Sequence, residues 1–151
     1  MNRKGITLIE LVIVMAIIAI GAVLLAPNIG AWMPTYRLKG ATRDVVSAMR
    51  VAQIKSVSNN IWYRVNFDSI NGKYSLESSP DLGVTWAKEG DDFILPGGVN
   101  ISQTAFVGIM ANTAVFYPDS STNGGSLTLI NTKGSQKVIS LLGTTGRIKH
   151  G

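Results

Sequence analysis

One carboxylate inside a long apolar stretch has the most unusual chemistry in this sequence. Glu10 is the only charged residue from Ile6 to Ala26, and an acidic side chain in an apolar environment costs free energy unless a positive group compensates it. A proteolytic cut after Gly5 creates an α-amine four residues before Glu10, and residues at that spacing share one helix face. We therefore expect Glu10 to pair with such an amine, in its own chain or in a neighbouring one.

The apolar stretch is the element that must position this carboxylate. At a rise of about 1.5 Å per residue, 6–26 forms a helix about 31 Å long, which matches the hydrocarbon core of a bilayer at about 30 Å. Arg3 and Lys4 precede it as a short basic leader, and cations beside a membrane helix favour the cytoplasmic side. We predict a leader at 1–5 and a transmembrane helix at 6–26, with the N-terminus inside the cell.

The sequence GITLIE at 5–10 resembles the class III signal of type IV pilins and type II secretion pseudopilins. The resemblance implies that a prepilin peptidase cuts between Gly5 and Ile6 and methylates the new amine of Ile6. Glu10 then takes the place of the family's acidic residue, which aligns a subunit with a neighbour's N-terminus during filament assembly. Ile6 is a departure, because Phe is more common at that position.

Two other interpretations of the N-terminus compete with this one. A secretory signal peptide ends its apolar region at a small-x-small site, but here Leu24 stands near Ala26 and Pro27 comes next, which makes a poor site. An uncleaved signal anchor is the stronger alternative, because only Gly5 and Glu10 argue against it. An enzyme or sensor on such an anchor requires a pocket that the sequence does not reveal.

Composition leaves room for one small domain after the apolar stretch. The 151 residues include no cysteine, which excludes a disulfide framework, a metal-thiolate site and a Cys nucleophile. Losing Arg3 and Lys4 reduces the formal net charge from +5 to +3, a mild excess that does not indicate nucleic-acid binding by itself. The single histidine, His150, lies beside the last residue, and the sequence has no nucleophile elbow or phosphate loop. We expect no enzyme activity, catalytic residue, metal site or cofactor.

A punctuated segment follows the apolar stretch. Pro27, Gly30 and Pro34 each weaken a helix, and Pro27 falls where many pilins carry a helix-kinking proline. We predict helix kinks at Pro27 and Pro34. They form either a flexible region of the subunit or simply the boundary turn at a membrane exit.

A kinked amphipathic continuation of the helix is predicted for 27–58. Apolar residues recur there at steps of three and four, which produces one stripe on the helix. The stripe comprises Leu38, Ala41, Val45, Ala48 and Ala52, widened by Val46, Met49 and Ile54. Lys39, Arg43 and Arg50 lie away from the stripe, and a solvated face is favoured over a binding patch for them.

From 59 to 151 the pattern is that of a β-rich globular domain. A half-buried strand is predicted at 61–68, because Ile61, Tyr63, Val65 and Phe67 alternate with more polar residues. Asn71-Gly72 then supplies a hairpin turn and 73–78 returns as a second strand. The segment 80–92 is interpreted as a loop with at most one short strand near 84–87. Further strands are expected at 93–95, 99–101, 106–109, 114–117, 127–130, 138–142 and 147–149.

These elements predict an α+β fold in which a long N-terminal helix packs on a C-terminal antiparallel β-sheet domain. Their order looks like the GspH/FimT branch of minor pilins and pseudopilins, and Phe116-Tyr117-Pro118 and Gly146-Arg147-Ile148 look like its later features. The resemblance implies an inner-membrane protein with its C-terminal domain in the periplasm, which later enters a filament. Its implied partners are prepilin peptidase, other pilin or pseudopilin subunits, the inner-membrane assembly platform and membrane lipid.

An acidic cluster raises the question of a cation site. Asp81, Glu89, Asp91 and Asp92 lie close together in the sequence, and calcium is bound by several carboxylate and carbonyl oxygens. The cluster lacks the regular alternation of an EF-hand loop. A solvated acidic loop is therefore the favoured interpretation.

The basic C-terminus raises the question of DNA binding. Some FimT-like proteins carry a Gly-Arg-x-Arg segment there and bind DNA during uptake, and in this chain Lys149 replaces the second Arg after Arg147. Two cations on one face of an edge strand can contact phosphates without reading sequence. Charged residues on a terminal strand also prevent edge-to-edge pairing, and this simpler role is favoured.

Overall fold

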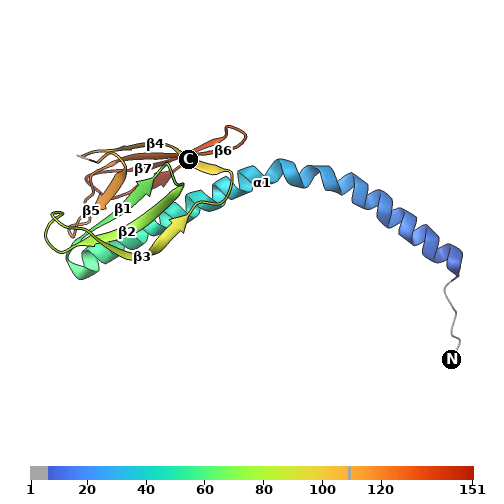
Figure 1. The fold of residues 1–151 in the computed structure, drawn as a ribbon, viewed down its shortest axis with the longest axis horizontal. Coiled ribbons are helices and arrows are strands. Elements are labelled where there is room, and N and C mark those ends of the chain that lie inside the picture. Colours follow the sequence, from blue (N-terminus) through green and yellow to red (C-terminus); the bar gives the residue numbers. More distant parts are fainter. Residues whose placement is uncertain (1–6, 109) are drawn as a thin grey trace, which may run out of the picture. The chain divides into compact units, whose positions relative to one another are not determined.

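The computed structural model describes residues 7–108 and 110–151 of the chain (Figure 1). The leader 1–5, the predicted cleavage site between Gly5 and Ile6, and the amine of Ile6 lie outside the described residues. Within these residues the protein forms two compact units, one ending at Met33 and one running from Pro34 to Gly151.

The helix α1 (Leu8–Asn59) begins immediately after Thr7. The hydroxyl and carbonyl oxygens of Thr7 lie 3.4 and 3.1 Å from the Glu10 amide nitrogen, which donates to them, so Thr7 acts as the N-cap. The helix ends where Asn60 adopts a positive φ of 55°, a backbone conformation that commonly terminates helices. Helix is continuous through Pro27 and Pro34, and the kinks there stay a prediction.

Two antiparallel sheets follow the helix. The first has the strand order β3-β2-β1-β5 and the second the order β4-β6-β7-β8. The strands are β1 (Trp62–Asp68), β2 (Lys73–Ser79), β3 (Ala87–Ile94), β4 (Val99–Phe106), β5 (Thr113–Phe116), β6 (Gly125–Asn131), β7 (Gln136–Leu141) and β8 (Ile148–His150). The α+β class is confirmed.

The core of the second unit joins the C-terminal half of α1 to both sheets. The stripe predicted for this helix is confirmed, since most of its members are almost fully buried. In β1 the predicted alternation also holds, with Tyr63, Val65 and Phe67 inward. Phe67 of the first sheet stacks on Phe106 of the second with ring centroids 5.7 Å apart. The two sheets and the helix therefore share one hydrophobic core.

Two local expectations, one in the helix and one in the first hairpin, differ from the structure. Ile54 was expected to widen the buried stripe, but it is exposed, because it lies on the opposite side of the helix from Met49 and Ala52. The Asn71-Gly72 turn is part of a longer connection between Asp68 and Lys73, in which Gly72 has a φ of 61°. The Asp68 carboxylate accepts hydrogen bonds from the amides of the next residues, which stabilises the longer turn.

The largest difference is strand β3. The acidic part of the predicted loop 80–92 is a strand that begins at Ala87 and pairs with β2. Its charges hid it from pattern analysis, because β3 is the outer strand of its sheet and most of its residues are exposed. Two lysines neutralise one of its acids: Lys73 and Lys88 lie 2.8 and 2.6 Å from the Asp92 carboxylate oxygens.

Candidate functional site

The predicted assembly residue Glu10 lies in the first turn of α1. Its side chain is exposed, and no cation among the described residues forms an ion pair with it. A shallow hollow of about 280 Å³ beside it is lined by Leu11, Val14, Met15 and Ile18. The carboxylate thus stands next to an apolar surface and is available to a positive group from another chain.

The apolar surface around Glu10 extends along the whole first part of α1. Large aliphatic residues are exposed at nearly every position from Leu8 to Val23, Leu8 at 81% and Leu11 at 54%. Consecutive helix positions cover all sides of the helix, so the segment is apolar all round. No helix among residues 7–108 and 110–151 has the length and hydropathy of a membrane span.

The predicted basic pair Arg147 and Lys149 lies at the C-terminal edge of the second sheet. Lys149 is in β8, the outer strand beside β7, where it lies opposite Ser140. Both cations are exposed, and neither forms an ion pair with a described residue. Arg147 directly precedes β8. Only Lys149 therefore lies on the edge strand itself, and a ligand for the pair stays a prediction.

The acidic residues considered for calcium are used in other ways. The Glu89 carboxylate accepts a hydrogen bond from the Lys55 ammonium, which lowers the pKa of Glu89. The Asp81 carboxylate accepts hydrogen bonds from the Ser79 and Thr85 hydroxyls, which hold the pKa of Asp81 at about 2. Within the described residues, His and acidic side chains form no group of three that could hold a metal ion.

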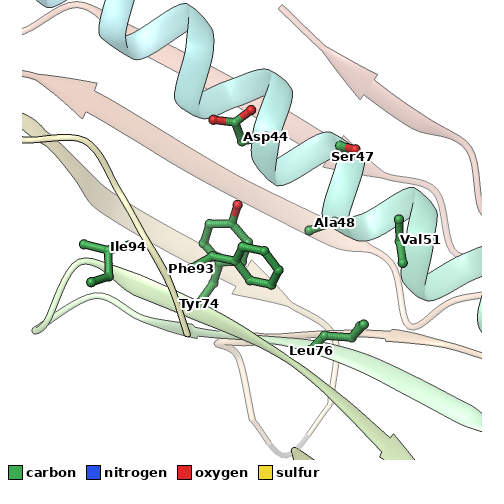
Figure 2. Close-up of a pocket in the computed structure, with 8 residues that line it drawn as sticks. All are labelled: Asp44, Ser47, Ala48, Val51, Tyr74, Leu76, Phe93 and Ile94. Atoms are coloured by element: carbon green, nitrogen blue, oxygen red, sulfur yellow. The ribbon is translucent and has the colours of Figure 1, made fainter. Parts of the chain in front are cut away.

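A groove between α1 and the first sheet was not anticipated (Figure 2). It has a volume of about 360 Å³, and four residues of α1 face four residues of β2 and β3 across it: Asp44, Ser47, Ala48 and Val51 against Tyr74, Leu76, Phe93 and Ile94. The rings of Tyr74 and Phe93 stack at 5.1 Å. Burial, with a smaller contribution from the charge of Asp44, raises the pKa of Tyr74 to about 12. The Tyr74 hydroxyl therefore stays neutral, and the groove offers mainly apolar contacts.

A second hollow lies on the outer face of the first sheet. The Arg64 guanidinium lies 4.1 Å from the ring centre of Trp86 and 2.6 Å from the Glu77 carboxylate. Trp62 packs edge-on against Tyr117 at 4.6 Å. Of these side chains, Trp62, Arg64, Trp86 and Tyr117 line a hollow of about 350 Å³. The only sequence signal for it was the outward position of Trp62 and Arg64 in β1, since the other residues come from distant segments.

Comparison with known proteins supplies two findings. The model of the prokaryotic N-terminal methylation motif matches residues 1–26. A comparison with curated proteins found no match.

The structure is similar to two structures of EpsH, a minor pseudopilin from the type II secretion system of Vibrio cholerae. One superposes with a TM-score of 0.62 at 11% identity, covering 76% of this chain and 96% of the other. The second has a TM-score of 0.60 at 9% identity, with coverages of 76% and 92%. The chain thus combines a prepilin-type methylation motif with the pilin-like fold of a minor pseudopilin.

Proposed function

We propose that this protein is a minor pilin or pseudopilin, a non-catalytic structural subunit of a type IV pilus or a type II secretion pseudopilus. The observation that carries the proposal is the coincidence in one chain of the methylation motif at 1–26 with the pilin-like fold. The fold alone is compatible with many functions. The motif adds a specific processing chemistry at the end of the chain where the apolar helix begins.

In this proposal, prepilin peptidase cuts between Gly5 and Ile6 and methylates the amine of Ile6. The chain is held in the inner membrane with its C-terminal domain in the periplasm. The assembly platform then transfers it into the filament, where its N-terminal helix exchanges lipid for neighbouring subunits. The exposed aliphatic side chains between Leu8 and Val23 support this step, because helices that leave lipid associate through close van der Waals packing of their side chains.

Glu10 provides the register of the assembly. A carboxylate that enters an apolar bundle alone is costly, and an α-amine from a neighbouring subunit removes most of that cost. The position of Glu10 in the first helical turn supports such a contact, because the carboxylate is near the end of the chain where that amine is created. Subunits can then pack only in the register that brings the two charges together.

The maturation step is tested by determining the N-terminus of the protein produced in a host that has prepilin peptidase. We expect mass spectrometry to find a chain that begins at methylated Ile6. A Gly5→Leu variant is the matched control, because a bulky residue at the cleavage position should leave the leader attached. A wild-type chain that still begins at Met1 contradicts the proposal and favours the uncleaved anchor.

A second candidate function is DNA binding by Arg147 and Lys149 at the tip of a pilus. It is supported by the exposure of both cations, Lys149 on the outer strand β8 and Arg147 directly before it, without ion pairs among the described residues. Phosphate contacts of this kind supply affinity that depends on salt and not on sequence. The competing role is protection of the β8 edge against pairing with another strand.

A gel shift with double-stranded DNA separates these two roles. For Arg147→Ala with Lys149→Ala we expect weaker binding and a salt dependence smaller by about two counterions. Arg50→Ala removes an exposed cation from α1 and should have a smaller effect. If the double variant binds DNA like the wild type but aggregates more readily, edge protection is the correct role.

A further inference from the structure

Four cationic or ionisable side chains meet at one hollow in the second unit. Lys39 and Arg43 of α1, Lys137 of β7 and His150 of β8 line a depression of about 200 Å³, together with Thr42. The residues come from three elements and from both ends of the globular unit. We name them the basic hollow.

The backbone explains why these residues converge. Lys39 and Arg43 are four positions apart and share one face of α1. Lys137 is two positions from the buried Ile139 along β7, and residues two apart in a strand share one face of the sheet. His150 lies directly opposite Ile139 in β8. Both side chains therefore point to the face of the sheet that carries the core. Lys149 points to the other face. The basic hollow is therefore distinct from the exposed pair formed by Arg147 and Lys149.

The charges of the basic hollow have no counterion within the described residues. Lys39, Arg43 and Lys137 take part in no ion pair there. The acid next to Arg43 in sequence is Asp44, but its side chain faces the groove that contains Tyr74 (Figure 2). Like charges held close together repel one another, so the hollow gains stability when an anion enters it.

We propose that the basic hollow is a binding site for a single phosphate group. Three cations around a small depression match the charge of a phosphate better than the single charge of a carboxylate, and the guanidinium of Arg43 can donate two parallel hydrogen bonds to phosphate oxygens. The Thr42 hydroxyl donates to the Leu38 carbonyl oxygen at 2.7 Å, so the charged side chains are the donors for the ligand. The proposal does not depend on the proposed function.

A phosphate titration of the full-length protein in non-ionic detergent tests the site. We expect inorganic phosphate, at constant ionic strength against chloride, to shift the NMR amide signals of 39–43, Lys137 and His150. Arg43→Gln and Lys137→Gln should each weaken phosphate binding by about tenfold, because each removes a charge-assisted hydrogen bond.

The matched control is Arg50→Gln. It removes the same charge from the same helix, about 10 Å further along, and it does not line the hollow. A defined site predicts unchanged phosphate affinity for this variant. If Arg50→Gln weakens binding as much as Arg43→Gln, the protein attracts anions through its general charge and the site is ruled out. Unchanged thermal unfolding of all three variants verifies that the fold is intact.

Two further probes identify the source of the phosphate. A short single-stranded oligonucleotide with a 5′-phosphate carries a phosphomonoester, and vesicles of phosphatidic acid with phosphatidylcholine carry one as a lipid headgroup. The source is the probe whose binding falls in Arg43→Gln and Lys137→Gln but not in Arg50→Gln. If neither probe nor inorganic phosphate follows this pattern, the proposal is overturned.

Discussion

The two compact units of the chain differ in where their apolar side chains find partners. In the first unit, the aliphatic residues of α1 from Leu8 to Val23 are mostly exposed. In the second unit, which begins at Pro34, many large apolar residues are packed between the helix and two sheets. A continuous exposed apolar surface of this kind marks an interaction site. The difference teaches that the second unit has its own core, whereas the apolar side chains described in the first unit stay exposed.

The ion pairs of the described residues lie in the second unit. In the second unit Glu77, Glu89 and Asp92 each face a cation of the same chain. In the first unit Glu10 has no such partner among the described residues. The described residues therefore supply no positive partner for Glu10, and we propose that a neighbouring subunit supplies it.

The largest expected effect comes from neutralising Glu10. Glu10→Gln keeps the size of the side chain and removes the charge that pairs with a neighbour's amine, so we expect incorporation into filaments to fall by more than tenfold while the second unit unfolds at the wild-type temperature. Immunoblotting of sheared filaments measures incorporation, and circular dichroism measures unfolding.

Asp91→Asn is the matched control for Glu10→Gln. Asp91 is an exposed acid of β3 that forms no ion pair with a described residue, so the variant makes the same charge change without touching the helix. It should assemble normally. If Glu10→Gln is incorporated into filaments as well as the wild type, Glu10 does not need a positive partner from a neighbouring subunit.

A pair of identical substitutions in the same helix gives the next largest effect. Leu38 is 1% exposed and Leu11 is 54% exposed. Leu38→Ala should lower the free energy of unfolding by about 2 to 5 kcal/mol. Leu11→Ala should change it by less than about 0.5 kcal/mol and should instead reduce assembly. Urea unfolding followed by tryptophan fluorescence distinguishes them, and similar losses of stability for both variants remove the contrast between the units.

The parts of the fold that local periodicity determines were predictable from the sequence. The stripe containing Leu38 and Val45 repeats at the helical spacing, and Tyr63, Val65 and Phe67 alternate as a strand requires. Strand β3 escaped because its exposed charged residues carry no such periodicity. The division into two sheets escaped as well, because β5 pairs with β1 across about fifty residues of intervening chain, and no local pattern encodes that contact.

The candidate sites divide in the same way. Glu10 was found because a single charge in an apolar run is a local signal. The basic hollow was not found, because Lys39 and Arg43 have the spacing of an ordinary solvated helix face and become a site only when the fold brings Lys137 and His150 to them. Sites of the second kind require α1 to lie beside β7 and β8, which come much later in the chain.

A smaller effect is expected at Gly146, which joins the C-terminal segment to the helix. The Gln53 side-chain amide donates to the Gly146 carbonyl oxygen at 3.2 Å, and a Cβ at Gly146 would overlap the Ser120 carbonyl oxygen and the Gln53 side chain. Gly146→Ala should therefore destabilise the second unit by about 1 to 3 kcal/mol beyond the backbone cost.

Gly72→Ala isolates that backbone cost. Gly72 and Gly146 have nearly the same φ, 61° and 60°, but a Cβ at Gly72 meets no atom within 4 Å. Gly72→Ala should lower the free energy of unfolding by only about 1 to 2 kcal/mol, which is the cost of placing a non-glycine residue in the left-handed conformation. Thermal unfolding compares the two variants. Equal losses show that the C-terminal segment is not held tightly against α1 and that the second unit is less self-contained than its core indicates.

The smallest effect is the pH response of the loop that carries Trp86. Hydrogen bonds from Ser79 and Thr85 lower the pKa of Asp81 to about 2, below the about 3.9 of an unfolded chain. A lowered pKa of Asp81 in the folded state stabilises that state at pH values above the pKa of the unfolded chain. This contribution to stability disappears as the pH falls toward 2.

We expect Trp86 fluorescence to change between about pH 4 and 2, because the Asp81 carboxylate that holds the loop becomes protonated. Other acids titrate in this range, so the difference from Asp81→Asn, which cannot titrate, isolates the response. If the wild type and Asp81→Asn have identical pH profiles of Trp86 fluorescence, contacts other than the hydrogen bonds to the Asp81 carboxylate order this loop.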